Sequence, residues 1–307
     1  MPSLSLNQLT IDRCRKIAEE VSRPVEKMIQ AHTSISVERA TLRLLGIDGA
    51  VAQAGLMFPK ANIITDVLKK KNALQRGVLF WFSNAMIQKN MTVQQIADGV
   101  CNGSLQITDL PLAPIEKIRQ KALELSQGAC ERIDQSKKTR NEIRKKTGDI
   151  FSKPMKTPAK YVIVATGNIY EDVIQAEAAA QAGADIIAVI RSTAQSLLDY
   201  VPHGATTEGY GGTYATQENF KIMRAALDKK SEELGRYIRL TNYCSGLCMA
   251  EIATMGSLER LDCLLNDAMY GILFRDINMK RTLLDQHFSR RILSRSEIMI
   301  QTGEDNY

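Results

Sequence analysis

The sequence predicts an α/β protein in which a helical region precedes a set of alternating strands and helices. Before about residue 150, apolar residues recur at the three- and four-residue spacing of helices. From Tyr161 onward, short runs rich in Val and Ile alternate with helical stretches instead. Such alternation implies parallel strands joined by crossover helices, in either an open doubly wound sheet or a barrel. We therefore expect a helical accessory region over residues 1–150 and a ligand-binding α/β region over residues 151–307.

The helices of the N-terminal region are predicted from capping residues and apolar spacing. Thr10 and Ser36 are candidate caps, and Pro24 is placed to open a helix between them. Thr92 can cap a later helix, and Pro114 can begin a long one. A linker with two prolines is expected at residues 146–160. Further helical stretches cover residues 63–71, 78–88 and 93–99.

The α/β region is predicted from short apolar runs, which are typical of strands buried on both faces. The predicted strands are Tyr161–Thr166, Asp185–Arg191, Tyr237–Tyr243, Leu261–Asn266 and Ile298–Gln301. The predicted helices are Ile169–Ala182, Asn219–Leu234, Cys248–Met255 and Leu283–Ile292, and Gly183 and Gly235 end the first two.

Composition is typical of an ordinary globular protein. Of the 307 residues, 44% are hydrophobic and 24% are charged. No apolar run approaches the roughly 20 residues that span a bilayer, and the first residues lack the apolar core of a signal peptide. We therefore expect a cytoplasmic protein without membrane contact, in which the six scattered cysteines are free thiols.

A basic run near the end of the long predicted helix raises the possibility of nucleic-acid binding. Six cations lie between Lys137 and Lys146, in a chain of net charge +6. No aromatic residue is interleaved for base stacking, and Asp134, Glu142 and Asp149 dilute the charge. We therefore predict a solvated surface here and no nucleic-acid partner.

Polar residues follow the predicted strands at their carboxyl ends, where open sheets and barrels both bind ligands. The clearest case is the strand that ends at Arg191, because Ser196 and a glycine-rich loop follow it. Buried polar groups cost free energy unless they are paired, so a scaffold alone would not place them at successive strand ends. The sequence therefore predicts one shared polar site. Its further candidates are Thr166, Asn168, Asn242, Tyr243, Ser245, Asn266, Asp267, Tyr270, Arg275, Thr302, Glu304 and Asp305.

Several long strings of the sequence resemble the family of lysine 5,6-aminomutase alpha subunits. They are IAVIRSTAQSLLDYVPHGATTEGYGGTYATQENF, RLTNYCSGLCM, LNDAMYGILFRDINM and the closing TGEDNY. The resemblance is dense over residues 161–307 and continues upstream through SVERATLRLLGIDG. It implies a TIM (β/α)8-type barrel preceded by a helical region, with pyridoxal 5'-phosphate bound at the barrel mouth.

The resemblance also implies roles for individual residues at the strand ends. Arg191 and Ser196 would contact the cofactor, chiefly its phosphate, and a guanidinium offers the forked donors that phosphate prefers. Ser245 would face the pyridine nitrogen, and Tyr270 would stack on the ring. Asp305 would meet the distant ammonium group of the substrate. The remaining cofactor neighbours would be Asn242 and Arg275.

The reaction that the resemblance implies is a radical 1,2-shift of the terminal amino group of D-lysine or beta-lysine. Pyridoxal phosphate would bind the amine, and adenosylcobalamin would supply the radical. In the family, a smaller beta subunit carries the cobalamin domain and the lysine that forms the Schiff base, so an alpha2beta2 complex is expected. Asp285 and His287 begin like a cobalamin-ligating motif, but Arg290 stands where that motif needs glycine. Cobalamin binding is therefore expected mainly on the partner.

Other expectations concern the extent of the barrel and the alternative functions. A complete barrel takes about 250 residues, more than follow Tyr161, so we expect a C-terminally truncated barrel that is inactive alone and exposes apolar surface. A relative that acts on ornithine is the nearest alternative. A barrel lyase or aldolase that binds a phosphorylated substrate through Arg191 and Ser196 is another. A non-enzymatic alternative is a helical interaction subunit that docks partners through residues 1–160.

Overall fold

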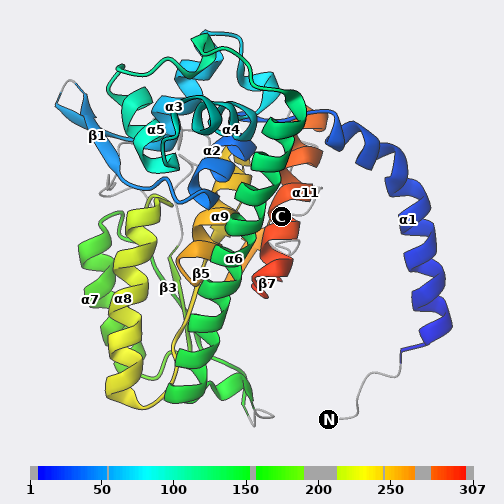
Figure 1. Ribbon diagram of the computed structural model, residues 1–307. Coiled ribbons are helices and arrows are strands. Elements are labelled where there is room, and N and C mark those ends of the chain that lie inside the picture. Colours follow the sequence, from blue (N-terminus) through cyan, green and yellow to red (C-terminus); the bar gives the residue numbers. More distant parts are fainter. Residues whose placement is uncertain are drawn as a thin grey trace.

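The computed structural model describes residues 6–53, 55–152, 157–189, 213–244, 246–266 and 278–301. Its N-terminal part is mainly helical, and its C-terminal part contains a parallel sheet with helices packed against it (Figure 1). The predicted α/β class is therefore confirmed. Within these described residues, no helix is both long enough and apolar enough to cross a bilayer.

The N-terminal part combines helices with one short antiparallel hairpin. Its core lies between the middle helices and includes Leu42, Ile64, Phe82 and Ile96, each of them fully buried. The helices are α1 (Gln8–Gln30), α2 (Ile35–Leu44), α3 (Lys60–Lys70), α4 (Val78–Lys89), α5 (Val93–Cys101) and α6 (Ile115–Thr147). The 3-10 turns are η1 (Leu74–Arg76), η2 (Ile107–Asp109) and η3 (Ile150–Ser152). The hairpin strands are β1 (Ala50–Gln53) and β2 (Leu56–Pro59).

The first helices begin slightly earlier than their sequence signals predict. Asn7, not Thr10, caps α1, and its side chain accepts the backbone N–H of Thr10. Ser34, not Ser36, caps α2 by accepting the N–H of Val37. Both differences arise because two residues of suitable chemistry lie within one turn of each other, and apolar spacing does not decide between them.

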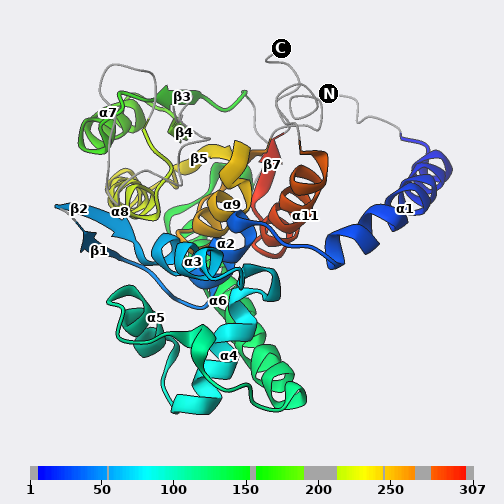
Figure 2. The same cartoon turned by 90° about the horizontal axis from the view of Figure 1, so that it is seen from above.

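Helix α1 extends away from the rest of the protein in both views (Figures 1 and 2). It continues through Pro24, which the sequence had suggested as the start of a separate helix. A proline inside a helix removes one backbone hydrogen bond, and here it does so on a stretch in which no residue is buried. The apolar side chains of Leu9 and Val21 are 81% and 71% exposed, so α1 adds little to the core.

The C-terminal part alternates strands and helices in the predicted order. The strands β3 (Tyr161–Val164), β4 (Ile186–Val189), β5 (Arg239–Cys244), β6 (Cys263–Asn266) and β7 (Met299–Gln301) pair in parallel. Their order in the sheet is their order in the chain, so each crossover adds the next strand on the same side. The helices of this part are α7 (Ile169–Gln181), α8 (Gln217–Leu234), α9 (Met249–Leu258), which follows the 3-10 turn η5 (Gly246–Cys248), and α11 (Met279–Arg295).

The two faces of the parallel sheet have different surroundings. One row of the register runs through Val164, Val189, Asn242 and Leu264, and its three apolar members belong to the core that the sheet forms with α7, α8 and α9. The neighbouring residues point to the opposite face because side chains alternate along a strand. On that face Ile163 is 53% and Met299 is 49% exposed. The described part of the sheet therefore has one helix-covered face and one partly open apolar face.

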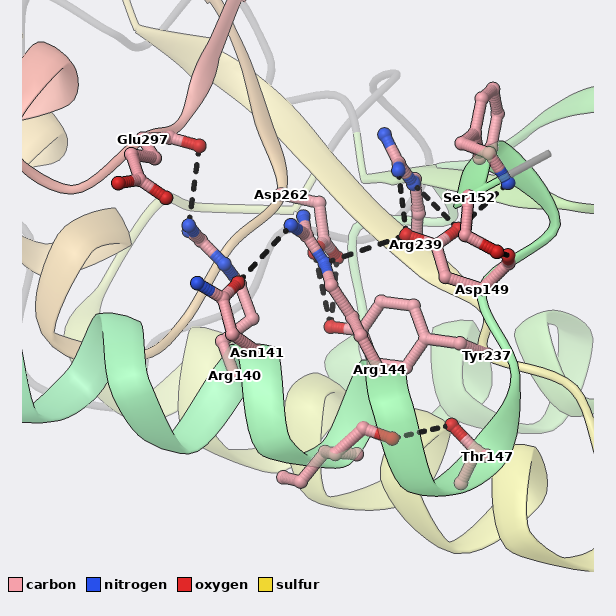
Figure 3. Close-up of polar contacts among 12 residues, drawn as sticks. Arg140, Asn141, Arg144, Thr147, Asp149, Ser152, Tyr237, Arg239, Asp262 and Glu297 are labelled. Atoms are coloured by element: carbon pink, nitrogen blue, oxygen red, sulfur yellow. Dashed lines mark hydrogen bonds and ion pairs between the residues drawn. The ribbon is translucent and has the colours of Figure 1, made fainter. Parts of the chain in front are cut away.

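Helix α6 joins the helical part to the amino-terminal edge of the sheet (Figure 3). Arg140 is 1% exposed and donates to the carbonyl oxygens of Leu261 at 2.7 Å and Ser296 at 2.5 Å, just before β6 and β7. Arg144 lies one turn later and donates to Asp262 at 2.6 Å. Both arginines belong to the basic run that we predicted to be a solvated surface, and that prediction is wrong for these two residues. The last turns of α6 lie against the amino-terminal edge of the sheet. Arg140 and Arg144 are buried there because backbone carbonyls and the Asp262 carboxylate accept their hydrogen bonds.

Asp262 is the centre of this network, and its side chain is fully buried. Besides Arg144, its donors are Arg224 at 3.2 Å, the Tyr237 hydroxyl at 3.0 Å and the Leu240 N–H at 2.8 Å. These donors come from α6, from α8, and from the start of β5 with the residue two positions before it. Burial raises the pKa of Tyr237, so its hydroxyl stays protonated and keeps donating. One carboxylate therefore fixes three elements at the edge of the sheet opposite the expected ligand site.

A second buried pair connects α2 to the helices over the sheet. The Arg43 guanidinium contacts the Glu251 carboxylate at 2.7 Å, and their side chains are 8% and 2% exposed. Arg43 also donates to Gln217 on α8 at 2.9 Å. The backbone N–H of Glu251 donates to the Ser36 hydroxyl at 3.2 Å. The helical part and the α/β part therefore share a buried polar interface.

Glu38 on α2 makes a pH-dependent contribution to the free energy of unfolding. Burial raises the pKa of Glu38 above 4.5, although Thr33 and the Val78 N–H both donate to the carboxylate. The folded state therefore binds the proton more tightly than the unfolded state, and this contribution to stability is lost as pH rises from 4.5 through the raised pKa. We expect Glu38→Gln, which does not titrate, to remove this part of the pH dependence.

The measurement is urea unfolding at several pH values between about 4 and 8. Glu116→Gln is the matched control, because that side chain is 82% exposed. A Glu38→Gln variant whose stability fell with pH as steeply as that of the wild type would contradict the prediction.

Candidate functional site

The carboxyl ends of β3 to β7 lie at one edge of the sheet, where parallel α/β sheets bind ligands. Four segments that carry predicted site residues come directly after these strands in the sequence: residues 190–212 follow β4, Ser245 follows β5, residues 267–277 follow β6, and residues 302–307 follow β7. Among the predicted cofactor and substrate contacts, Asn242 is described by the structure. The others lie outside the described residues and remain predictions: Arg191, Ser196, Ser245, Tyr270, Arg275 and Asp305.

Asn242 is a buried polar residue near the carboxyl end of β5, and it is 2% exposed. Leu240 and Cys244, which share its face by alternation, belong to the core under the helices. Within the ranges that the structure covers, neither the amide nitrogen nor the amide oxygen of Asn242 has a hydrogen-bond partner. A buried amide without partners costs about 1–3 kcal/mol. This cost is unusual in a packing role and indicates a polar group that needs a partner at this edge.

The end of β3 is organised by a second buried polar group, the Asp172 carboxylate on the first turn of α7. It accepts the backbone N–H of Thr166 at 2.7 Å and the Thr166 hydroxyl at 2.8 Å. It also accepts the hydroxyl of Thr213, the residue that follows segment 190–212. Asn168 caps α7 by accepting the N–H of Tyr170 at 3.0 Å. Thr166 and Asn168, both predicted for the site, therefore hold the corner between β3 and α7.

Asn266 closes the sheet edge between β5 and β6. It is fully buried, and its amide donates to the Cys244 carbonyl at 3.2 Å. Its oxygen accepts from Arg290 on α11 at 3.4 Å. These contacts give Asn266 a structural role, in which it joins two strand ends to a helix.

A cavity of about 470 Å³ lies where the N-termini of α2 and α11 converge. Asp285 accepts from Ser34 at 2.5 Å and from Arg281 at 2.8 Å inside it. These polar groups bind one another, so the cavity itself does not indicate a charged ligand. Its lining residues are Thr33, Ser34, Ile35, Ser36, Leu74, Gln75, Asn278, Arg281 and Asp285.

Sequence reasoning missed Asp172. An acidic residue in the first turn of a helix is commonly explained by the helix dipole, and its partner Thr213 is 41 residues away. The available signal was its position one turn after a strand end that was already in the candidate set. In the part of the chain that the structure describes, no group of three or more His, Cys, Asp or Glu side chains could hold a metal ion.

Comparisons with known proteins give one consistent result. A family model described as the TIM-barrel domain of the D-lysine 5,6-aminomutase alpha subunit matches residues 4–307. The chain is 51% identical over 304 residues to the lysine 5,6-aminomutase alpha subunit of Acetoanaerobium sticklandii. The aligned region covers 99% of this chain and 57% of that protein. It is 52% identical over 307 residues to the subunit of the same name from Fusobacterium nucleatum subsp. nucleatum. The aligned region covers 100% of this chain and 58% of that protein.

A more distant relative is the D-ornithine 4,5-aminomutase subunit beta of Acetoanaerobium sticklandii. It is 33% identical over 192 residues, which cover 61% of this chain and 26% of that protein. The chain thus spans a little over half the length of the two lysine aminomutase subunits that it matches.

Proposed function

The chain belongs to the family of the D-lysine 5,6-aminomutase alpha subunit, and from this premise we propose that it forms the pyridoxal-phosphate-binding part of a lysine 5,6-aminomutase. The observation that carries the proposal is the identity of 51% and 52% over nearly the whole chain to two subunits of that name. The reaction would be an isomerisation in which the terminal amino group of D-lysine or beta-lysine moves by one carbon, as a step of lysine degradation.

The α/β part is proposed to be an arc of a TIM (β/α)8-type barrel, with residues 1–150 as a helical accessory region and residues 151–307 as the partial barrel. The description of the family model supports this, as does the strand order, because every strand follows its predecessor without reversal. A doubly wound sheet would reverse direction at its ligand site. The partly open apolar face would then correspond to the barrel interior.

The expected pyridoxal 5'-phosphate fits the side chains that follow the strand ends. A guanidinium and a serine hydroxyl, from Arg191 and Ser196, suit the phosphate, and a tyrosine ring suits stacking on the pyridine. The unpartnered amide of Asn242 supports a polar ligand or a ligand-holding loop at the same edge. Because Asn242 lies on the helix-covered face, we assign it a place behind the ligand. In the remaining proposed roles, Ser245 faces the pyridine nitrogen, Arg275 is a second cation beside the cofactor, and Asp305 meets the substrate ammonium group.

Pyridoxal phosphate and adenosylcobalamin would together supply the radical amino-shift chemistry. The chain's own residues would bind the phosphate, orient the ring and exclude water from the mouth. The Schiff-base lysine and most contacts to cobalamin are assigned to a beta subunit in a cytoplasmic alpha2beta2 complex. The alpha-subunit names of the two relatives support such a partner.

The main competing substrate is ornithine. The ornithine aminomutase relative shares 33% identity over 61% of the chain, well below the value for the lysine aminomutase subunits. We therefore favour lysine. A lyase or aldolase and a purely structural interaction subunit have no comparable support.

The experiment combines the chain with a cobalamin-binding beta subunit, pyridoxal phosphate and adenosylcobalamin. We expect the pyridoxal absorption band to shift on assembly, and D-lysine or beta-lysine to be turned over while ornithine is not. Turnover of ornithine alone would move the chain to the ornithine group. The absence of both a spectral change and turnover in the assembled complex would reject the aminomutase assignment.

Arg191→Gln tests the assignment of the phosphate site in the same complex. A hydrogen bond to a charged group contributes about 1.5–3 kcal/mol, so the affinity for pyridoxal phosphate should fall roughly ten- to a hundredfold, whereas affinity for pyridoxal, which lacks the phosphate, should change little. Arg295→Gln is the matched control, because Arg295 forms an ion pair with Asp134 and is 45% exposed. Equal losses for pyridoxal and its phosphate would show that Arg191 does not bind the phosphate.

A further inference from the structure

The hairpin of β1 and β2 is a two-stranded sheet that projects from the body of the protein in both views (Figures 1 and 2). Among the residues that the structure describes, neither strand pairs with a third one. The apolar side chains of Leu56 and Met57 are 52% and 43% exposed. A two-stranded hairpin by itself is at best marginally stable in water. The hairpin therefore has the properties of a sheet that another strand completes.

The register of the hairpin shows which of its backbone groups point outward. The N–H of Lys60 donates to the Gly49 carbonyl at 3.1 Å, so these two residues form a hydrogen-bonded pair at the base. Such pairs alternate with non-hydrogen-bonded pairs along an antiparallel ladder. Val51 with Phe58, and Gln53 with Leu56, are therefore the next pairs that bond inward. The residues whose backbone groups point outward are Ala50 and Ala52 on β1, and Met57 and Pro59 on β2.

The two outer edges differ in what they offer. Pro59 has no N–H to donate, which blocks the β2 edge at its base. On the β1 edge, Ala50 and Ala52 each present an N–H and a carbonyl, and no residue in the described ranges binds them. Edge strands are commonly protected by charged side chains or proline, but residues 49–53 contain neither. The β1 edge is therefore open to pairing with a further strand.

The base of the hairpin is fixed beside the carboxyl edge of the parallel sheet. Asp48 accepts the N–H of Gly49 at 2.7 Å and forms an ion pair with Lys221, on the second turn of α8. Helix α8 lies between the parallel strands β4 and β5 in the chain, so it runs from the carboxyl ends of the strands back to their amino ends. Its first turns are therefore at the edge where the candidate site lies.

We propose that the outer edge of β1 pairs with an extended strand of the beta subunit. The proposal rests on the proposed function, which supplies this partner. A row of unpaired backbone groups fits an extended chain, because a strand repeats its donors and acceptors at the same spacing. A subunit that covers the carboxyl edge of the sheet also reaches the hairpin, whose base is fixed there by Asp48 and Lys221.

The length of β1 argues against a second copy of this chain as the occupant. The strand has four residues, which span roughly 13 Å. A symmetric pair of such strands is far smaller than the about 800 Å² per partner that a stable interface buries. The added strand therefore belongs to a partner that makes further contacts elsewhere.

Hydrogen exchange at single-residue resolution tests the pairing directly, with the full chain measured alone and in complex with the beta subunit. We expect the N–H of Ala52 to exchange roughly tenfold more slowly in the complex, because it gains a hydrogen bond. The N–H of Met57 is the internal control. It lies opposite Ala52 in the register but on the β2 edge, so its exchange should change little.

Ala52→Pro removes the outward N–H of β1 and leaves the inward bonds of the hairpin in place. Titration with the beta subunit should show roughly tenfold weaker binding, because one hydrogen bond is lost and the proline ring obstructs the added strand. Met57→Pro is the matched control, since it removes the corresponding N–H from the other edge and should bind like the wild type. Slow exchange at Val51 and Phe58 confirms that the hairpin forms in both variants.

The outcomes separate this proposal from the proposed function. A complex in which Ala52 exchanges as in the isolated chain, or in which the two proline variants bind equally well, would overturn the pairing at β1 and leave the proposed function intact. Exchange at Ala52 that slows when the chain alone is concentrated would assign the edge to a second copy and also overturn the proposal. Protection of Ala52 in a complex that does not turn over lysine would support the pairing while the proposed function fails.

Discussion

Asp262→Asn is expected to lower the free energy of unfolding by about 3–5 kcal/mol, the usual cost of removing one partner from a buried ion pair. The asparagine keeps the size of the side chain but removes the charge that pairs with Arg144, at 2.6 Å, and with Arg224, at 3.2 Å, and it leaves Asp228, at 2.8 Å, as the remaining carboxylate partner of Arg224. Arg224 is 1% exposed and cannot turn to water. The amide would also present an N–H to at least one of these cations. The loss should appear as a lower urea midpoint by circular dichroism.

Asp134→Asn is the control for this prediction. Asp134 also pairs with an arginine, Arg295, at 2.7 Å, but the two side chains are 43% and 45% exposed. Exposed pairs contribute at most about 1 kcal/mol, so this variant should unfold close to the wild type. If the two substitutions were equally mild, the network beneath the sheet would not be a centre of stability.

Arg43→Met is expected to cost about 3 kcal/mol, because it leaves the Glu251 carboxylate buried without its cation. Removing both charges, as Arg43→Met with Glu251→Met, should recover much of this loss, since two apolar chains of similar volume replace an ion pair that was expensive to desolvate. The double variant still loses the contact with Gln217, so recovery should be incomplete.

A double-mutant cycle by urea unfolding measures this coupling. The two single variants and the double variant are compared at one pH. Additive losses would contradict a direct interaction between Arg43 and Glu251, and would show that each side chain acts through separate neighbours.

Local signals in the sequence predicted most helices and strands of this protein. Thr92 does cap α5 with a full capping box, and Pro114 immediately precedes α6. The strands from β3 to β7 follow the predicted apolar runs, each within a few residues. Gly235 ends α8 in the left-handed conformation, which glycine adopts without strain. These features depend on a few neighbouring residues, so a short window of sequence is enough to predict them.

The features that were not predicted either carry a weak local signal or depend on distant contacts. The hairpin of β1 and β2 was missed, because its strands are only four residues each and lack clear alternation. The burial of Arg140 depends on carbonyls 121 and 156 residues further along the chain. Nothing in the composition of the basic run separates Arg140 from its exposed neighbour Lys138.

The candidate site shows the same division. Its location at the carboxyl edge of the sheet follows from strand order, which the alternating pattern predicts. The burial of the Asn242 amide and the contact between Asp172 and Thr213 depend on the three-dimensional arrangement of strands and helices. Pairing between remote residues is the information that periodicity lacks.

The long helix α6 has a consequence for how this protein is made. A ribosome delivers Arg140 and Arg144 more than a hundred residues before the acceptors that these two cations need, at Asp262 and Ser296. Closing contacts across such sequence distances is slow. The guanidinium groups of α6 therefore stay hydrated until these acceptors are synthesised. We expect the docking of α6 against the amino-terminal edge of the sheet to limit the rate of folding.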